Sequence, residues 1–288
     1  MKPPVCLITG GTDGVGKVTA IELARRGYTV VLAARSASKA QALVKEIAAS
    51  TGNVRTEFIP ADLASLRQVR RLAEAFQRRH GALDVLVNNA GVFLGARTET
   101  EDGFETTFQV NYLSHFLLTS LLLGALKSSD QGRVINLSSS VYSMGVFEPD
   151  DLQSKRRYSV LGTYAATKLE MLMFTRELAK RLRGTAVTAN AVHPGIVRTQ
   201  MMLSAPGVLR VVSYLSLPFS VSPERGARTS LHLASSPELR GVSGEYFASG
   251  KPTIAHNRYD TEENRALLWQ LSEEAVRASA ASRAREAS

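Results

Sequence analysis

A tyrosine and a lysine stand four positions apart in the stretch TYAATK, as Tyr164 and Lys168. On a helix, residues i and i+4 share one face. A free phenol has a pKa of about 10, and a nearby positive charge stabilises the phenolate and lowers that pKa. Such a pair can give a proton to an oxygen atom or take one from it, as the reduction of a carbonyl requires. The same spacing is also common by chance, so the surrounding sequence must show whether this pair is catalytic.

A glycine-rich stretch, GGTDGVGK, follows the apolar run CLIT near the start of the chain. Its glycines have the spacing G-x-x-x-G-x-G, which differs from the G-x-G-x-x-G fingerprint. Glycine permits a tight turn there and lets backbone amides approach a pyrophosphate at the start of a helix. Because the stretch lies between the first expected strand and helix, it predicts a dinucleotide site formed by Gly10, Thr12, Asp13, Gly14, Val15 and Gly16.

The second apolar run ends in VVLAAR, with Ala34 followed by Arg35. NAD-binding proteins usually have a carboxylate here for the ribose 2′-hydroxyl, whereas an arginine suits the 2′-phosphate of NADP. Asp13 in the glycine loop argues the other way, since it is expected near that phosphate. We predict NADP(H) as the cofactor, with NAD(H) as the alternative.

Short β-rich runs alternate with longer helical ones along the chain. Apolar runs without strict polar alternation, separated by amphipathic helices, predict a parallel sheet covered on both faces. We therefore expect an α/β fold, a single Rossmann-type doubly wound parallel sheet with helices on both faces. The expected strands are 5–10, 29–35, 54–62, 83–91, 132–140, 186–195 and 244–247, and the helices are 17–27, 38–50, 66–81, 108–126 and one containing Tyr164.

Two segments depart from this rhythm. Residues 201–223 are apolar without clean periodicity, and we interpret them as a lid over an apolar substrate; the alternative is a loop with a short buried helix. Residues 261–276 predict a surface helix, with a frayed tail after it. The predicted organisation is one dinucleotide-binding and catalytic domain over residues 1–260, followed by the C-terminal helix and tail over 261–288.

The composition of the 288 residues is that of an ordinary globular protein, with 44% hydrophobic and 21% charged residues. The net charge is +9, but the basic residues are scattered among acids on helical stretches, so we expect solvated helix faces and no nucleic-acid partner. The single cysteine, Cys6, excludes an intramolecular disulfide. The histidines lack ligand-like spacing, so no metal site is expected. Without an evident signal peptide or transmembrane stretch, a cytoplasmic location is the default expectation.

In combination and order, the motifs TGGTDGVG, NNAG, NLSSS, YAATK and HPG resemble the short-chain dehydrogenase/reductase superfamily. The resemblance spans residue 5 to about residue 250. Three longer stretches, FQVNYLSHFLLT, DLQSKRRYS and TRELAKRLRGTAVTANAVHPG, resemble its retinol dehydrogenase-like branch.

The resemblance implies roles for individual residues. Tyr164 is the expected catalytic acid, and Lys168 both supports it and holds the nicotinamide ribose. Oxidised nicotinamide adds further positive charge beside the phenol. Ser139 is the serine that matches the residue orienting the substrate oxygen, with Ser138 and Ser140 as alternatives. Asn111 matches a helix asparagine that holds a water linked to the lysine.

The remaining residues implied by the resemblance are cofactor contacts. They lie beside the adenine, at the end of a strand near the adenosine ribose, and after HPG near the nicotinamide amide. In that order they are Asp62 and Leu63; Asn88, Ala90 and Gly91; and Pro194, Gly195, Val197 and Thr199. His193 carries no family role and is interpreted as structural.

The predicted function is hydride transfer between NADP(H) and an alcohol/carbonyl pair, with a lipophilic ketone or aldehyde suggested by the apolar 201–223 segment. One alternative is a nucleotide-sensing regulator on the same fold. Another is reduction of a carbon–carbon double bond, or epimerisation. The resemblance further implies a homodimer or homotetramer, and the basic charge with an apolar lid permits peripheral membrane contact.

Overall fold

The structure is a computed structural model that describes residues 2–197 and 220–286. The predicted lid over 201–223 therefore lies outside the described residues except for its last positions, and Thr199 lies outside them altogether.

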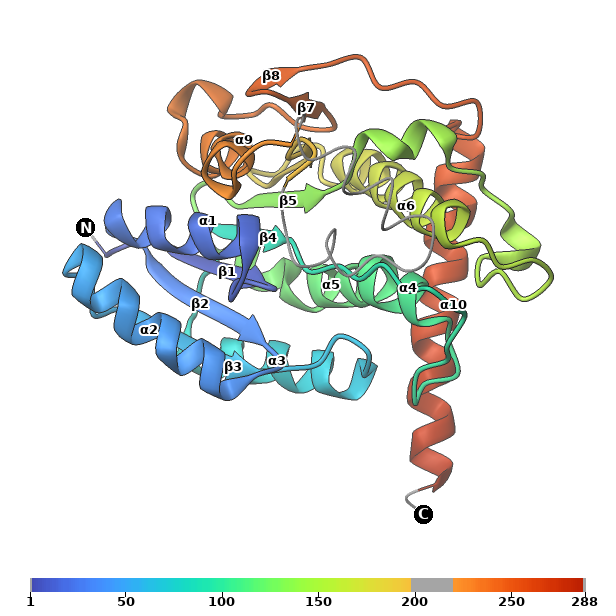
Figure 1. The fold of residues 1–288 in the computed structure, drawn as a ribbon, viewed down its shortest axis with the longest axis horizontal. Coiled ribbons are helices and arrows are strands. Elements are labelled where there is room, and N and C mark those ends of the chain that lie inside the picture. Colours follow the sequence, from blue (N-terminus) through green and yellow to red (C-terminus); the bar gives the residue numbers. More distant parts are fainter. Residues whose placement is uncertain (1, 198–219, 287–288) are drawn as a thin grey trace.

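An eight-stranded sheet runs through the middle of the molecule (Figure 1). Its spatial order is β3-β2-β1-β4-β5-β6-β7-β8, with every pair parallel except the last, β7 with β8. The strands are β1 (Val5–Thr9), β2 (Thr29–Ala34), β3 (Thr56–Pro60), β4 (Val85–Asn88), β5 (Arg133–Leu137), β6 (Thr188–His193), β7 (Tyr246–Ala248) and β8 (Lys251–Pro252).

The strand order reverses between β1 and β4, because the chain first winds outward to β3 and then returns to the other side of β1. In such sheets the crevice at the carboxyl ends of the strands, at this reversal, is where ligands bind. Both the glycine loop after β1 and the residues after β4 lie there. The predicted fold is confirmed.

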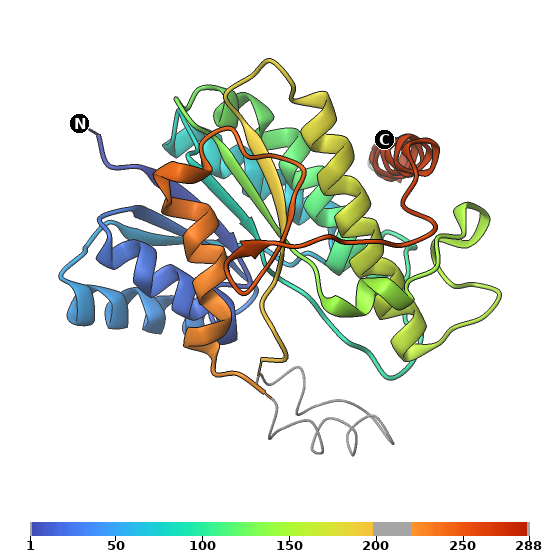
Figure 2. The same cartoon turned by 90° about the horizontal axis from the view of Figure 1, so that it is seen from above.

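Helices cover both faces of the sheet, as Figure 2 shows. One face carries α1 (Gly14–Arg25), α2 (Ala37–Thr51) and α9 (Pro223–Ser235), and the other carries α3 (Leu66–Arg79), α5 (Ser114–Lys127) and α6 (Val160–Arg181). Each face has its own apolar core: Leu23, Ile47 and Leu231 pack on the first, and Phe76, Phe116 and Phe174 on the second. The strands between them are buried on both sides, which explains their lack of polar alternation.

Side-chain caps explain where several helices begin. The carboxylate of Asp13 accepts a hydrogen bond from the Gly14 amide at the start of α1, and serine hydroxyls cap four of the others. These are Ser36 before α2, Ser65 before α3, Ser159 before α6 and Ser222 before α9. A short helix α4 (Thr106–Phe108) and a π-helical turn η1 (Gln109–Leu113) precede α5, and a 3-10 turn η2 (Ser140–Met144) follows β5.

The C-terminal helix α10 (Glu262–Glu286) packs against α6 and α3. Leu268, Trp269 and Val276 are buried in the second core, and Trp269 packs edge-on against Phe116. A helix was expected here and is present on the surface of the molecule, with one apolar side packed against α5 and α6 and most of its other side chains exposed or half-buried. The helix extends to Glu286.

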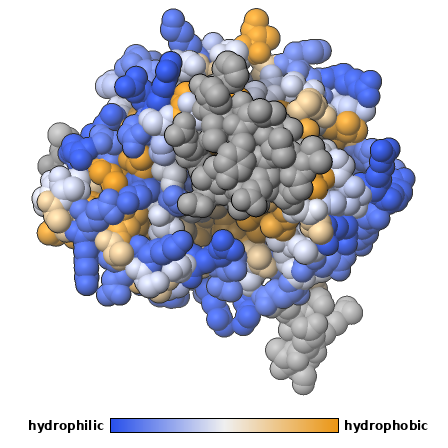
Figure 3. Space-filling view, in the orientation of Figure 1, coloured by the Kyte–Doolittle hydropathy of each residue, from blue (hydrophilic) through white to orange (hydrophobic). Residues whose placement is uncertain are grey.

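Many basic residues pair with acids along the outer helices, as Arg25 does with Glu22 and Arg181 with Glu177. On the face in Figure 3, hydrophilic residues predominate, with apolar side chains in separate patches between them. In the described ranges 2–197 and 220–286, no helix is sufficiently long and apolar to cross a membrane.

Candidate active site

The glycine loop packs directly against the residues that follow β4. Gly10 has a positive φ of 64°, and a Cβ there would lie 2.9 Å from the Cα of Ala90. At Gly16 a Cβ would lie 2.4 Å from the Nδ2 of Asn89 and 2.5 Å from the Gly10 carbonyl oxygen. Both positions therefore need glycine, one for its backbone conformation and close approach and the other for packing.

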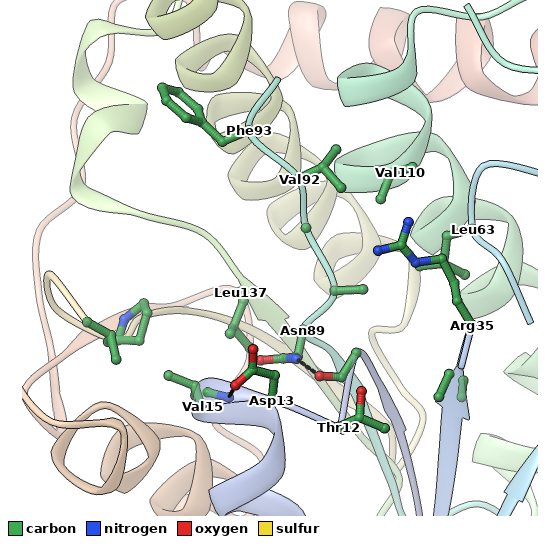
Figure 4. A pocket seen from close by; sticks show the side chains of 18 of the residues that line it. Thr12, Asp13, Val15, Arg35, Leu63, Asn89, Val92, Phe93, Val110 and Leu137 are labelled. Atoms are coloured by element: carbon green, nitrogen blue, oxygen red, sulfur yellow. Dashed lines mark hydrogen bonds between the residues drawn. The ribbon is translucent and has the colours of Figure 1, made fainter. Parts of the chain in front are cut away.

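A cavity of about 540 Å³ lies over this loop, at the carboxyl ends of β1, β2, β4, β5 and β6. Figure 4 shows Asp13, Val15, Asn89 and Leu137 around the loop, with Arg35 at the end of β2. Most of the residues predicted from the sequence line this one space: Gly10, Thr12, Asp13, Gly14, Val15, Arg35, Asp62, Leu63, Ala90, Gly91, Ser138, Ser139, Tyr164, Lys168, Pro194, Gly195 and Val197.

Tyr164 and Lys168 lie one turn apart on α6 at one end of the cavity. The Lys168 Nζ is 5.5 Å from the centroid of the Tyr164 ring and donates a hydrogen bond of 3.0 Å to the Leu137 carbonyl. Burial raises the pKa of Tyr164 to about 12 and lowers the pKa of Lys168 to about 8. Lys168 does not bring the pKa of Tyr164 toward neutral pH here, contrary to expectation, because burial dominates both groups.

The three candidate serines after β5 occupy different environments. Ser138 is buried, and its hydroxyl donates to the Lys168 carbonyl oxygen at 2.8 Å. Ser139 is half-buried at the cavity wall, and its hydroxyl oxygen accepts a long bond, 3.5 Å, from the Val141 amide. Ser140 is exposed at the start of η2 and is not among the residues that line the cavity. Ser139 thus has the hydroxyl best placed to meet a bound substrate.

Asn111 is fully buried in the π-helical turn and lies behind the cavity wall. Its side-chain oxygen accepts from the Val92 amide at 2.7 Å, and its amide nitrogen donates to the Val92 carbonyl at 3.0 Å and to the Thr167 hydroxyl at 3.3 Å. A Cβ on Gly91 would lie 3.4 Å from the Asn111 Oδ1 and 3.9 Å from the Lys168 Nζ. Asn111 and Lys168 therefore flank Gly91 closely.

At the other end of the cavity, Asp62 accepts a bond from the Ala64 amide through one carboxylate oxygen, which fixes the turn after β3. Asn88 does not line the cavity. Its side chain is buried inside the sheet, where it donates to Asn136 and Thr119. Asn89 lines the cavity in its place, because successive side chains of a strand point to opposite faces.

His193, at the end of β6, accepts a bond of 3.3 Å through Nδ1 from the Ser140 amide, and burial lowers its pKa. This contact steadies the loop that carries the serines, in keeping with a structural role.

The cavity lining includes residues that were not foreseen, among them Asn89, Lys39 and Phe93. Asn89 binds the Thr9 and Gly10 carbonyls at 2.8 and 3.1 Å, and the stretch NNAG contained the signal for it. Lys39 follows one turn into α2, on the same side as Arg35, so the cap at Ser36 could have suggested it. The Phe93 ring packs edge-on against the Tyr164 ring at 5.1 Å, a contact without a local sequence signal.

Within the described ranges, no group of three histidine, cysteine, aspartate or glutamate side chains is arranged to hold a metal ion.

The family profile described as short chain dehydrogenase matches residues 4–206. Retinol dehydrogenase 12 of Mus musculus is 43% identical over 268 residues, which cover 93% of this chain and 84% of that protein. A solved structure of an uncharacterised protein of Mycobacterium paratuberculosis is similar with a TM-score of 0.75 and 32% identity, covering 96% of this chain and 95% of that one. The Pseudomonas aeruginosa RhlG/NADP active-site complex is similar with a TM-score of 0.68 and 28% identity, covering 86% and 97%.

These similarities extend over nearly the whole chain and include the part that forms the cavity. They confirm the expected superfamily and its branch. The chain belongs to the short-chain dehydrogenase family, in its retinol dehydrogenase-like branch, and is an oxidoreductase acting on CH–OH groups.

Proposed function

We propose that this chain transfers a hydride between NADP(H) and a lipophilic alcohol/carbonyl pair. The observation that carries the proposal is the cavity itself, which joins the glycine loop and Arg35 at one end to Tyr164, Lys168 and Ser139 at the other.

The residues present fit a dinucleotide. The cavity volume of about 540 Å³ lies within the usual range for small-molecule sites. Gly10 and Gly14 line the cavity with positive φ angles and without side chains. The backbone can therefore approach a pyrophosphate beside the start of α1. When bound, the nicotinamide supplies or accepts the hydride.

The protein's own residues handle the proton and the orientation of the substrate. With its raised pKa, Tyr164 is protonated at neutral pH and can donate to the oxygen of a carbonyl that is being reduced. The half-buried Ser139 hydroxyl can hold that oxygen in place. For alcohol oxidation Tyr164 must lose its proton, and positive charge beyond Lys168 is needed, which oxidised nicotinamide would contribute.

The preference for NADP(H) is supported by the charges at the end of β2. The exposed side chains of Arg35 and Lys39 both border the cavity, with Ser36 between them at the start of α2. Two cations and a helix N-terminus favour a 2′-phosphate over a free 2′-hydroxyl. The RhlG complex named above contains NADP, which is consistent with this choice.

A lipophilic substrate is supported by the apolar surface beside Tyr164. Phe93 packs on the Tyr164 ring, and Leu94 and Val92 line the same wall. Leu161, on α6 one turn before Tyr164, is exposed. The similar mouse protein is named for retinol, itself a lipophilic alcohol.

The first experiment measures oxidation of NADPH and NADH with a panel of lipophilic and small carbonyls, for the wild type, Tyr164→Phe and Arg35→Ala. We expect turnover with NADPH that falls by about 10³-fold or more in Tyr164→Phe, since the phenol proton is lost. Arg35→Ala should raise the KM for NADPH at least about tenfold and leave NADH little changed, because a charge-assisted contact is removed. Arg78→Ala, an exposed arginine on α3, is the matched control.

Three results would contradict parts of the proposal. Tight NADPH binding without turnover on any compound would favour a nucleotide-sensing regulator. Equal kinetics with both nucleotides in the wild type would remove the NADP preference. Turnover that survives in Tyr164→Phe would remove the assigned proton donor.

A further inference from the structure

His115 is the fully buried second residue of α5, and none of the roles assigned above uses it. Its Nε2 lies 3.0 Å from the Thr9 hydroxyl, and its Nδ1 lies 3.2 Å from the Asn111 carbonyl oxygen. Thr9 ends the strand that carries the glycine loop, whereas Asn111 lies in the π-helical turn. One imidazole therefore joins two parts of the site that are far apart in sequence.

The hydrogen bonds of Thr9 determine which imidazole nitrogen carries the proton. The Thr9 hydroxyl oxygen accepts from the Asn89 amide at 2.9 Å and from the Ala90 amide at 3.0 Å, which occupies both of its lone pairs. Its single hydrogen is left to donate. The Val87 carbonyl is a distant acceptor at 3.4 Å, so the closer Nε2 of His115 receives that hydrogen.

If Nε2 accepts, the proton of a neutral imidazole is on Nδ1 and points at the Asn111 carbonyl. The charged form would put a hydrogen on Nε2 facing the Thr9 hydroxyl, whose lone pairs are already used. Burial, with the nearby positive charge of Lys168, lowers the pKa of His115 to about 4, so the neutral form is retained through the physiological range.

The segment 89–92 is held by the two groups that His115 joins. Thr9 binds the amides of Asn89 and Ala90, and the Asn111 side chain binds both backbone groups of Val92. Gly91, between them, is the residue flanked by Lys168. His115 connects Thr9 and Asn111 on the side away from the cavity. A shift of the imidazole would therefore move Thr9 and Asn111 relative to each other.

We propose that His115 is a positioning residue with two separable actions. Its Nδ1–H fixes the Asn111 turn relative to Lys168 and so supports the proton-transfer step. Its Nε2 fixes Thr9, and through Asn89 and Ala90 the wall of the cofactor cavity. The inference deepens the proposed oxidoreductase function and rests on it.

The test separates the two actions with three variants. His115→Asn keeps a donor near Nδ1 and loses the acceptor toward Thr9, so it should raise the coenzyme KM about fivefold or more with kcat close to wild type. His115→Gln reaches toward Thr9 and loses the donor to Asn111, so kcat should fall about tenfold or more with a smaller change in KM. His115→Phe should show both effects, because small displacements in a site cost large factors in rate.

The control for a purely structural effect is Leu122→Ala, which removes a fully buried side chain on the same helix, two turns from His115. It should lower the melting temperature without a selective change in either kcat or KM. The proposal is overturned if, in all three His115 variants, kcat falls and KM rises together. The same holds if both changes scale with the loss of melting temperature, as they should in Leu122→Ala.

Two further measurements do not need turnover and keep the inference separate from the proposed function. The ¹⁵N shifts of the His115 imidazole in the wild type should report the neutral Nδ1–H tautomer from pH 5 to 8. NADPH binding by fluorescence should be weaker in His115→Asn than in His115→Gln. An Nε2–H tautomer, or equal affinities in the two variants, would refute the positioning role whether or not the enzyme turns over the chosen substrates.

Discussion

Ser138 and Ser139 are neighbours in sequence, yet only the Ser139 hydroxyl is available to contact a substrate in the cavity. The Ser138 hydroxyl is buried and bound to the Lys168 carbonyl, whereas Ser139 is half-buried and, among the described residues, accepts one long bond from the Val141 amide. The extended end of β5 turns successive side chains in opposite directions, which separates a structural serine from a candidate catalytic one.

Ser139→Ala is therefore expected to lower kcat about 10²-fold, the usual cost of losing one polar contact to a reacting oxygen, with little change in melting temperature. Ser138→Ala should instead destabilise the fold by about 1 kcal/mol through its lost buried hydrogen bond, with a much smaller effect on kcat. Steady-state kinetics and thermal unfolding of both variants check this. A larger kcat loss in Ser138→Ala would reverse the assignment.

Sequence reasoning located Tyr164, Lys168 and the glycine loop because motif order and spacing are local properties. It placed Asn88 in the cavity instead of Asn89, since the phase of side chains at a strand end depends on where the hydrogen-bond ladder stops. It also missed the direction of the Tyr164 pKa shift. That shift follows from burial by residues distant in sequence, such as Phe93, which the local stretch YAATK does not encode.

Among the elements, the strands and long helices were predictable because their apolar runs are nearly continuous or periodic. The π-helical turn η1 was not, since one extra residue per turn leaves the hydrophobic pattern of 108–126 almost unchanged. The packing of α10 was also missed, because the same pattern of leucine, tryptophan and valine suits a free amphipathic helix or a docked one.

Helix α6 contains a buried acid, Glu170, whose Oε2 has no hydrogen-bond partner in the part of the chain that the structure describes. Burial, with the charge of the buried Glu105 as a smaller cause, raises its pKa well above the ordinary value. The folded protein therefore keeps a proton that the unfolded chain loses above about pH 4.5. Stability must then fall as pH rises from that value toward the raised pKa.

Glu170→Gln removes this titration and should stabilise the protein near pH 8 by about 1.4 kcal/mol for each unit by which folding raises the pKa of Glu170. The gain should shrink toward pH 5, where the wild-type carboxyl is protonated. Chemical unfolding at several pH values measures it, with the exposed Glu74→Gln as the control. A gain of equal size at pH 5 and pH 8 would disprove the linkage.

At the scale of the whole molecule, α10 covers the outer side of α5 and α6. Trp269 contacts Phe116 and Phe174, and the Arg181 guanidinium lies 4.2 Å from its ring centroid. Tyr112 and Ser272 are joined by a buried hydrogen bond of 2.7 Å. The proposed homo-oligomer would have to form on another surface, or displace α10 from this one.

Trp269→Ala should destabilise the fold by about 3–5 kcal/mol, because a large buried side chain is replaced by a cavity. Unfolding in denaturant, followed by circular dichroism, measures the loss. Arg277→Ala, an exposed change on the same helix, should cost less than about 0.5 kcal/mol. A loss below about 1 kcal/mol for Trp269→Ala would mean that α10 contributes little to the stability of the fold.

Trp269 is the only tryptophan in the chain. Tryptophan fluorescence of this protein therefore comes from a single site, where α10 packs against Phe116, Phe174 and Arg181. Its wavelength and quenching therefore report whether that helix stays packed on Phe116 and Phe174. The protein thus contains a built-in optical reporter for release of its C-terminal helix, readable without any added label.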